Sequence, residues 1–414
     1  MAEVNLDLRG QPAERQMAAL REQFERLRGQ GATVRALVDE DPARLYVSML
    51  EGGYRVWLER AANGLALVLQ PDASTPRRQP GAHSLVVHRD GRVYVNTTDD
   101  RLAVIDGASR KVLRHIAVGR DPQHLELSPD HSRLYVANSG SNDVSVIDTA
   151  TDTVMATGAT GRRPLLPCVA SDGSLFLPSG PDETLTALSA DGQPLATMPV
   201  GQSPHDVAIS PDARWAYQPN SGSHSLTIVD AARRSVAGEI PVGKGPGHVA
   251  FTPDSRFAFV ANTLSDDLTV VGVANHEAIG TIPAGPGAHM PVLSHDGRTG
   301  YVADFVSDDL AVWDVDRRAP LGRIAVGIYP HAFAISPDNR WLVVSSTGAS
   351  DVCIVDVEEQ RTVARLPVGG GPGHVDFDPE GGCAFVACQI SNQVAAIDFR
   401  NQRLIDLIDA GSAS

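Results

Sequence analysis

The chain has 414 residues, of which 42% are hydrophobic and 21% charged, and its formal net charge is −15. This composition is typical of a soluble globular protein. The acidic excess argues against a nucleic-acid backbone or an anionic membrane surface as the main partner. The length exceeds what one core usually holds, so it predicts several domains or one repeat array.

The first residues, MAEVNLDLRGQPAERQ, lack the basic and apolar regions of a secretory signal. No apolar run reaches the roughly 18 residues of a membrane-spanning helix. We therefore expect a cytoplasmic protein, or a periplasmic one if a signal has been removed. The four cysteines, Cys168, Cys353, Cys383 and Cys388, form no C-x-x-C pair and are expected to be small buried hydrophobes in a reducing compartment. Cys383 and Cys388 are predicted to point to opposite faces of one strand.

Residues 1–71 are predicted to form a small α+β domain of order β-α-β-α-β-β. Strands are expected at 4–10 and 32–40, and a hairpin at 54–60 and 64–70. Helices are expected at 13–29 and 41–53, the second with Asp41 as N-cap and Pro42 at its first position. Residues 72–80, rich in proline and polar side chains, form the linker.

The segments LDLRG and DEDPARLYVSMLEGGYRVW in this first domain resemble the TusA-like sulfur-carrier superfamily, especially its uncharacterised branch without cysteine. Sulfur-carrying members have a Cys-Pro pair shortly after the Arg-Gly, and here the stretch reads RGQPAERQ. The resemblance therefore implies a docking role for this domain rather than sulfur transfer.

From residue 81 to 414 the chain repeats. The glycines that open successive units are 40 or 42 residues apart: Gly119, Gly161, Gly201, Gly243, Gly285, Gly327 and Gly369. With an earlier unit from about residue 80, this makes eight units, each of which reads as four short strands separated by turns. The pattern predicts an all-β, eight-bladed β-propeller, with seven blades as the alternative.

The stretch LYVANSGSNDVSVIDTATDTV (134–154) and its counterparts FAFVANTLSDDLTVV and TGYVADFVSDDLAVWDV resemble the YVTN family of β-propeller repeats. The resemblance covers about residues 80–410 and implies a binding scaffold. Both terminal units look whole, so we expect closure without a strand exchanged between the termini, unless residues 72–80 add one.

Histidines recur where the first strand of each unit leaves its G-x-x-P loop. This loop and the loop between the second and third strands are expected on one face, with the Ser-Pro-Asp turns on the other. The first strands should line the axis. When the units are aligned on the acidic residue of their turn, seven histidines follow the proline position by one or two residues: His83, His124, His205, His248, His289, His331 and His374. Because neighbouring residues on a strand point oppositely, it stays open whether the two sets split, one toward the channel and one into the blade.

Two interpretations of this ring stay open. Duplication copies residues, so the imidazoles can simply bond the backbone of the next blade. Alternatively, they can be ligands of a metal or haem, since imidazole commonly binds both.

The loops before the ring carry basic residues: Arg77, Arg78, Arg120, Arg162, Arg163 and Lys244. In an acidic chain, this rim indicates either an anionic ligand, whose carboxylates guanidinium groups bind well, or ordinary solvated loop charge. The facing loops carry acidic residues that we interpret mainly as turn and ladder residues of the repeat: Asp143, Asp266, Asp267, Asp308, Asp309 and Asp351.

Imidazoles beneath arginines on an eight-bladed disc resemble the haem d1 propeller of dissimilatory nitrite reductases and the related protein used in building that haem. The resemblance implies a d-type haem at the mouth of the propeller. No C-x-x-C-H occurs, so a complete nitrite reductase is not expected. The four tryptophans are too few for a quinoprotein dehydrogenase, and no G-x-S-x-G supports a serine hydrolase.

Two functions therefore remain. The first is a cofactor- or metal-binding propeller, a haem d1-like accessory or biosynthetic protein or one that binds a transition metal such as copper. The second is a non-enzymatic interaction scaffold that offers its top face to a partner protein. Whether any reaction is catalysed stays open.

Overall fold

The computed structural model describes residues 3–9, 15–16, 19–20, 22–23, 33–38, 55–61, 64–70 and 81–411. Within these residues the protein is almost entirely β-structure, with a single short 3-10 helix at Gly180–Asp182. No helix in the described part has the length and apolar character needed to cross a membrane.

The N-terminal segment contributes one four-stranded sheet. Its strands are β1 (Glu3–Asp7), β2 (Thr33–Val38), β3 (Arg55–Ala61) and β4 (Gly64–Gln70), in the spatial order β1-β2-β4-β3. β1 runs parallel to β2, and β3 and β4 form a hairpin, so the four predicted strands are confirmed. Helical residues at 15, 16, 19, 20, 22 and 23 fall within the first predicted helix. The second predicted helix and the linker lie outside the described residues, and the TusA-like assignment stays a prediction.

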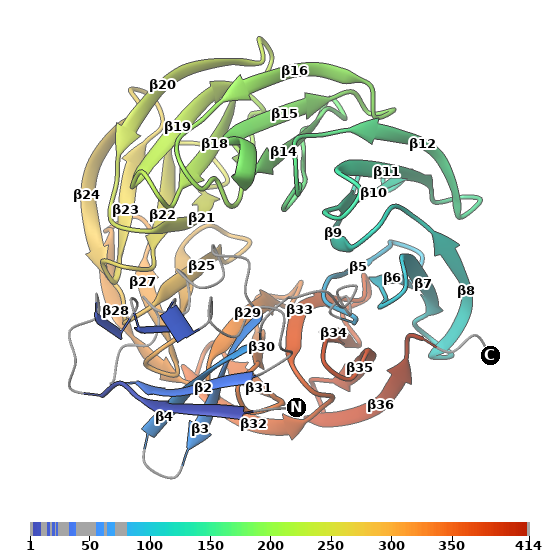
Figure 1. Cartoon of the computed structure of the whole chain (residues 1–414), viewed down its shortest axis with the longest axis vertical. Coiled ribbons are helices and arrows are strands. Elements are labelled where there is room, and N and C mark those ends of the chain that lie inside the picture. The colour runs from blue at the N-terminus through green and yellow to red at the C-terminus, as the bar shows by residue number, and fades with distance from the viewer. Residues whose placement is uncertain are drawn as a thin grey trace.

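The repeat forms eight four-stranded antiparallel sheets around one axis (Figure 1), so the count of eight is confirmed and the alternative of seven is wrong. Blades 1 and 2 consist of β5 (Leu85–Val87), β6 (Arg92–Asn96), β7 (Arg101–Asp106), β8 (Lys111–Ala117), β9 (Pro122–Leu127), β10 (Arg133–Asn138), β11 (Asp143–Asp148) and β12 (Thr153–Ala159). Blades 3 and 4 consist of β13 (Cys168–Val169), β14 (Leu175–Ser179), β15 (Thr184–Leu188), β16 (Pro194–Pro199), β17 (Ala208–Ile209), β18 (Trp215–Asn220), β19 (Ser225–Asp230) and β20 (Ser235–Pro241).

Blades 5 and 6 consist of β21 (Pro246–Phe251), β22 (Phe257–Asn262), β23 (Asp267–Gly272), β24 (Glu277–Pro283), β25 (Ala288–Leu293), β26 (Thr299–Asp304), β27 (Asp309–Asp314) and β28 (Ala319–Ala325). Blades 7 and 8 consist of β29 (Pro330–Ile335), β30 (Trp341–Ser346), β31 (Asp351–Asp356), β32 (Arg361–Pro367), β33 (Pro372–Phe377), β34 (Ala384–Cys388), β35 (Gln393–Asp398) and β36 (Arg403–Asp409). The first strand of each blade is innermost and the fourth is outermost.

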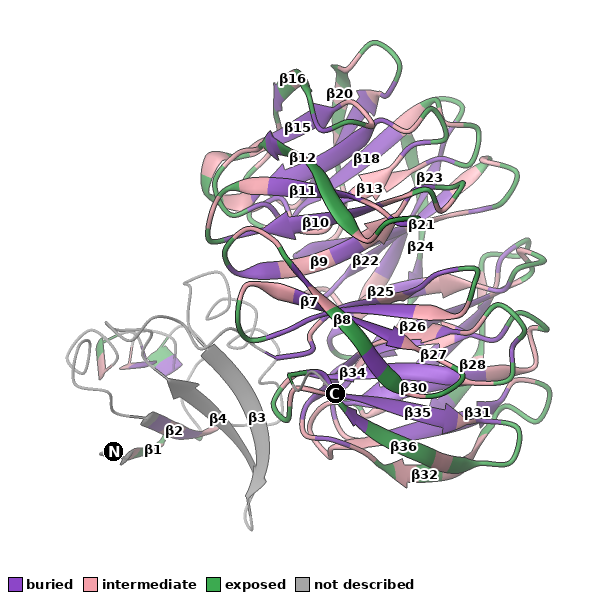
Figure 2. Ribbon diagram, turned by 90° about the vertical axis from the view of Figure 1, so that its right-hand side faces the viewer, coloured by how far each residue is buried: buried purple, intermediate pink, exposed green. Residues whose placement is uncertain are grey.

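Each blade is buried on both faces by its neighbours, which explains the apolar runs of the second and third strands. Figure 2 shows these middle strands largely buried, while outer strands such as β8 and β36 carry exposed residues. The apolar clusters lie between blades: one joins Tyr94 of blade 1 to Leu134 of blade 2, and another joins Phe259 of blade 5 to Trp313 of blade 6. As predicted, Cys383 packs toward blade 1 and Cys388 toward blade 7. All four cysteines are unpaired.

The ring closes between blades 8 and 1 by packing and hydrogen bonds. Each of the eight sheets is built from consecutive strands, so among the described residues no strand is exchanged between the termini, as expected. Instead, the Gly81 amide donates to the Gln389 carbonyl at 2.8 Å, and the Val87 amide donates to the Asp376 carboxylate at 2.8 Å. Val93 and Phe385 belong to one apolar cluster across this seam.

The predicted assignment of loops to faces is confirmed. In blade 2 the amides of Ser139 and Gly140, between the second and third strands, donate to the carbonyls of Asp121 and Arg120 in the G-x-x-P loop. The same pairing recurs in blade 5 between Leu264 and Lys244. We call this the loop face. The Ser-Pro-Asp turns lie at the other ends of the inner strands, and we call that the turn face.

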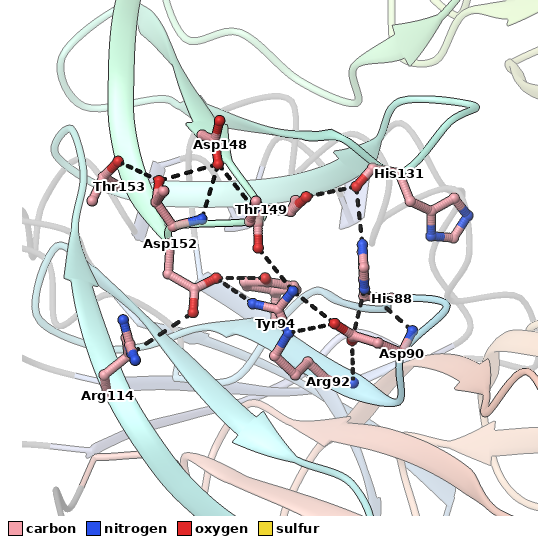
Figure 3. A network of polar contacts seen from close by, with 12 residues as sticks. His88, Asp90, Arg92, Tyr94, Arg114, His131, Asp148, Thr149, Asp152 and Thr153 are labelled. Atoms are coloured by element: carbon pink, nitrogen blue, oxygen red, sulfur yellow. Dashed lines mark hydrogen bonds and ion pairs between the residues drawn. The ribbon is translucent and has the colours of Figure 1, made fainter.

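A polar network on the turn face ties blade 1 to blade 2 (Figure 3). The Tyr94 hydroxyl of β6 donates to the Asp152 carboxylate of blade 2 at 2.6 Å, and the Arg92 guanidinium donates to the same oxygen at 2.7 Å. The Asp152 side chain is only 6% exposed, so these contacts compensate the desolvation of its charge. Two further blades use the equivalent tyrosine: Tyr135 reaches the Ala190 carbonyl, and Tyr217 reaches His276.

We predict that Tyr94→Phe lowers the free energy of unfolding by about 1.5–3 kcal/mol, because it removes a hydrogen bond to a buried carboxylate. The control is Tyr301→Phe, since Tyr301 is equally buried but its hydroxyl makes no hydrogen bond to a described residue. Denaturant unfolding of both variants measures the difference. Equal losses in both variants would show that the network contributes nothing beyond packing.

Candidate functional site

Seven histidines surround the axis near the loop face. His124, His248, His289, His331 and His374 lie at the start of inner strands β9, β21, β25, β29 and β33, while His83 and His205 lie just before β5 and β17. In Figure 1 these inner strands are the ones nearest the axis. Blade 3 has no histidine at this position, as its sequence predicts.

Imidazoles from both positions contact one another, as His83 does with His124 and His205 with His248, so the alternative in which one set points into the blades is wrong. The rings form two clusters, between which electrostatic interactions such as that of His331 with His83 extend. The first holds His83, His124 and His374, with ring centroids 5.1–5.8 Å apart. The second holds His205, His248 and His289, with centroids 4.4–6.1 Å apart, and His331 lies 5.7 Å from His289.

Five of the eight inner strands depart from simple alternation because they begin with a bulge. In β9, His124 pairs with Ala137 and Pro122 with Asn138, so Gln123 has no opposite residue. The same shift occurs after the proline of β21 and at the start of β25, β29 and β33. A bulge adds one residue to one strand only, which turns residues at both positions toward the same side.

Hydrogen bonds set the tautomer of two of these rings. Nδ1 of His248 donates to the Asp206 carboxylate at 2.9 Å, and Nδ1 of His83 donates to the Gln123 carbonyl at 3.3 Å. An imidazole that donates from Nδ1 keeps its lone pair on Nε2 when it is neutral. A carboxylate behind a histidine is also the usual second contact of a metal ligand.

Several imidazole nitrogens of the ring are buried and make no hydrogen bond to any described residue. They are Nδ1 of His124, His205 and His289, and Nε2 of His248. The His248 side chain is the most enclosed of the ring, since the residue is 8% exposed. Buried polar atoms usually have partners, so these nitrogens indicate a ligand or ordered water.

Burial keeps most of the ring neutral. Desolvation is the main cause that lowers the pKa of His205 to about 4 and the pKa values of His331 and His374 to about 3. It also lowers the pKa of His83, and it holds the pKa values of His124 and His289 well below the usual range. Neighbouring imidazoles add to the effect for each except His83, because two adjacent positive charges repel. These rings therefore carry free lone pairs at neutral pH.

Three carboxyl groups accompany the histidines on the inner strands, and sequence reasoning missed them. Glu126, Asp206 and Asp376 interact electrostatically on the axis, and burial raises the pKa of Glu126 to about 8 and that of Asp376 to about 6. A signal was present, because Glu126 follows His124 by two residues and Asp376 follows His374 by two. Side chains two apart on a regular strand share a face.

In the described part of the chain, no three His, Cys, Asp or Glu side chains are close enough together to hold a metal ion as placed. The ring thus brings imidazoles to one axis without a preformed set of three ligands. A metal bound there would require rotation of these side chains.

The basic rim is only partly a cluster of available charges. Arg120 and Lys244 are exposed in their loops. Arg163 is also exposed but makes contacts within the chain, and Arg162 forms an ion pair with Asp182. Arg77 and Arg78 lie outside the described residues. The acidic loop residues are structural where contacts are seen: Asp143 and Asp267 accept from the asparagines of their blades, and Asp309 accepts from Arg323. Asp266 and Asp308 accept from backbone amides of the next blade, and Asp351 pairs with Pro367 in its sheet.

Comparisons with solved structures agree on the fold. Dihydro-heme d1 dehydrogenase NirN, solved in complex with DHE, is similar with a TM-score of 0.66 and 18% identity, over 81% of this chain and 75% of that chain. Hydrazine synthase of Kuenenia stuttgartiensis has a TM-score of 0.56 and 18% identity, over 79% of this chain and 98% of that chain. At such identities the likeness shows the fold alone.

Sequence comparisons give the relationship. "Seven-bladed beta-propeller protein Rv1057" of Mycobacterium tuberculosis is 29% identical over 197 residues, which is 38% of this chain and 50% of that protein, so the match spans half of the curated relative. The family described as "YNCE-like beta-propeller" matches residues 56–176. The family described as "Lactonase, 7-bladed beta-propeller" matches residues 181–361 and 325–410, together more than half of the chain. This chain therefore belongs to the lactonase-type, 7-bladed β-propeller family, of which it is an eight-bladed member.

Proposed function

We propose that this chain binds a transition metal, free or as the iron of a haem-type cofactor, on the imidazoles at the loop-face end of its axis. The observation that carries the proposal is the set of buried, unpartnered ring nitrogens, above all Nε2 of His248. Neutral imidazole is a common ligand of copper, zinc and iron. Duplication alone would explain why the histidines recur, but it does not explain why buried ring nitrogens lack partners.

His248 is the strongest candidate for the first ligand. The Asp206 carboxylate accepts a hydrogen bond from Nδ1 of His248. This contact holds the ring so that Nε2 points away from the carboxylate. His205 and His289, whose centroids lie 5.1 and 4.4 Å from that of His248, are the candidates for further ligands. Because they are not preset around one point, binding would rotate them toward the metal.

A haem-type cofactor fits two further features of this face. The Phe305 ring is parallel to that of His331, with an interplanar angle of 5°, and its centroid lies 4.2 Å from that of His289. An apolar ring therefore lies beside the imidazoles. Arg120 and Lys244 carry positive charge in loops of the same face, where they would pair with carboxylates of the cofactor. A bound haem would supply redox or ligand-binding chemistry at iron. The protein would supply an imidazole to hold it and basic side chains to pair with its carboxylates. The fold similarity to NirN supports this source, and a free metal ion is the other source of the same chemistry.

Titration of the purified chain with Cu²⁺ and, separately, with haemin should distinguish the two sources. We expect a new absorption band with one of them, and at least about tenfold weaker binding after His248→Ala or His289→Ala. His295→Ala is the matched control, because His295 is exposed on the turn face outside the ring. No spectral change with either probe, or an equal loss in His295→Ala, would contradict the proposal and leave the interaction scaffold as the better account.

Metal binding also requires neutral imidazoles. Whether these rings are neutral can be tested from the pH dependence of the free energy of unfolding of the ligand-free chain. The pKa of His331 is lowered to about 3, whereas an unfolded histidine titrates near 6.5, so between these values the unfolded state binds more protons. Stability should therefore fall as the pH decreases from 7 to 5. His331→Gln should reduce this loss by about 1–2 kcal/mol, whereas His295→Gln should not change it. An unaltered pH dependence in His331→Gln would show that His331 is already protonated or solvated in the folded chain.

A further inference from the structure

A second site lies on the axis nearer the turn face, in a cavity of about 380 Å³ between blades 2 and 5. Its wall includes Pro211, the proline of the Ser-Pro-Asp turn of blade 4, and Phe251 at the far end of β21. Neither the histidine ring nor the family assignment accounts for this cavity.

Two inner strands beside the cavity pair over unusually short stretches. β13 and β17 each have two residues, whereas β9 and β21 on either side have six. In blade 3 the segment Leu166–Pro167 precedes the short strand and lines the cavity. A volume near 400 Å³ is within the range of small-molecule sites.

The wall is apolar except for two carboxyl groups and one thiol. The polar residues are Glu126, Asp206 and Cys168, and the remaining lining residues are Leu166, Pro167, Val207, Ala208, Ile209, Pro211, Val249 and Phe251. The Cys168 thiol stays protonated, because burial raises its pKa. The cavity therefore has apolar walls and one side that carries two carboxyl groups.

Glu126 is the group without a structural role. Both oxygens of Asp206 are engaged, one with the Val207 amide at 2.8 Å and the other with His248, whereas the Glu126 carboxyl makes no hydrogen bond to a described residue. Burial and the nearby charges of Asp376 and Asp206 raise the pKa of Glu126 to about 8. A carboxyl group that lines an apolar cavity and makes no hydrogen bond to a described residue is a natural partner for a cation.

We propose that this cavity binds a small organic ammonium ion, whose charge pairs with Glu126 beside Asp206 and whose apolar part packs on Phe251 and Ile209. A bare metal ion would leave the apolar wall unused, and no three metal-ligating side chains of the described residues converge here. A neutral apolar ligand would leave the carboxyl unpaired. Only a cation with an apolar body uses both halves of the wall, and an aromatic ring such as that of Phe251 also favours a cation.

Calorimetric titration with 2-phenylethylamine and with its neutral counterpart 2-phenylethanol tests this site. We expect the amine to bind at least about tenfold more tightly than the alcohol at pH 8.5, and Glu126→Gln to remove that preference. Glu277→Gln, on the exposed outer strand β24, is the control and should leave amine binding unchanged. Because Glu126→Gln replaces an unpaired acid by a neutral amide, its unfolding midpoint should not fall below that of the parent chain.

Equal binding of the alcohol and the amine, undiminished amine binding in Glu126→Gln, or no binding of the amine at millimolar concentration would each overturn the proposal. His331→Ala should leave amine binding intact, because the ring contacts of His331 are with His289, Phe305 and Tyr329 rather than with the cavity, and this separates the site from the histidine ring.

Discussion

The convergence of eight inner strands on one axis is the constraint on which the rest of this structure depends. Each blade is covered on both faces by its neighbours, so the axial edge is the place where polar side chains of different blades meet. A side chain placed there is desolvated by the other blades. It also lies near side chains of the same type, because the repeat places similar residues at the same position of each blade. The lowered pKa values of the histidines and the raised pKa values of Glu126 and Asp376 follow from this one geometry.

The polar groups on the axis form two layers, and the hydrogen bond between His248 and Asp206 joins them. Imidazoles lie near the loop face and carboxyl groups lie below them, while Asp206 both lines the cavity and accepts a hydrogen bond from His248. The repeat is broken at blade 3, which lacks a histidine and has a two-residue inner strand. That break creates the asymmetry that a binding site needs, because eight identical blades would present the same groups all around the axis.

Much of this architecture could be predicted from the sequence. A fixed period indicates repeated blades, and apolar residues along the strands indicate faces that are buried between neighbouring blades. The spacing of the opening glycines predicted eight blades, and the loop motifs predicted which loops share a face. The orientation of the histidines could not be predicted, since the bulges after Pro122 and Pro246 shift the register by one residue without a distinctive sequence signal. The cavity could not be predicted either, because it depends on where the two short inner strands stop pairing. The role of the N-terminal segment remains a prediction from resemblance.

We propose that the imidazoles of the ring hold a metal around Nε2 of His248, which is buried and has no partner among the described residues. Crystals of the chain equilibrated with Cu²⁺ or haemin, measured at the absorption edge of the metal, would test it most directly. We expect an anomalous-scattering peak about 2 Å from Nε2 of His248, with the ring of His205 or His289 turned toward the metal. A peak elsewhere on the molecule, or none while the His248–Asp206 hydrogen bond and the ring remain as described, would contradict it.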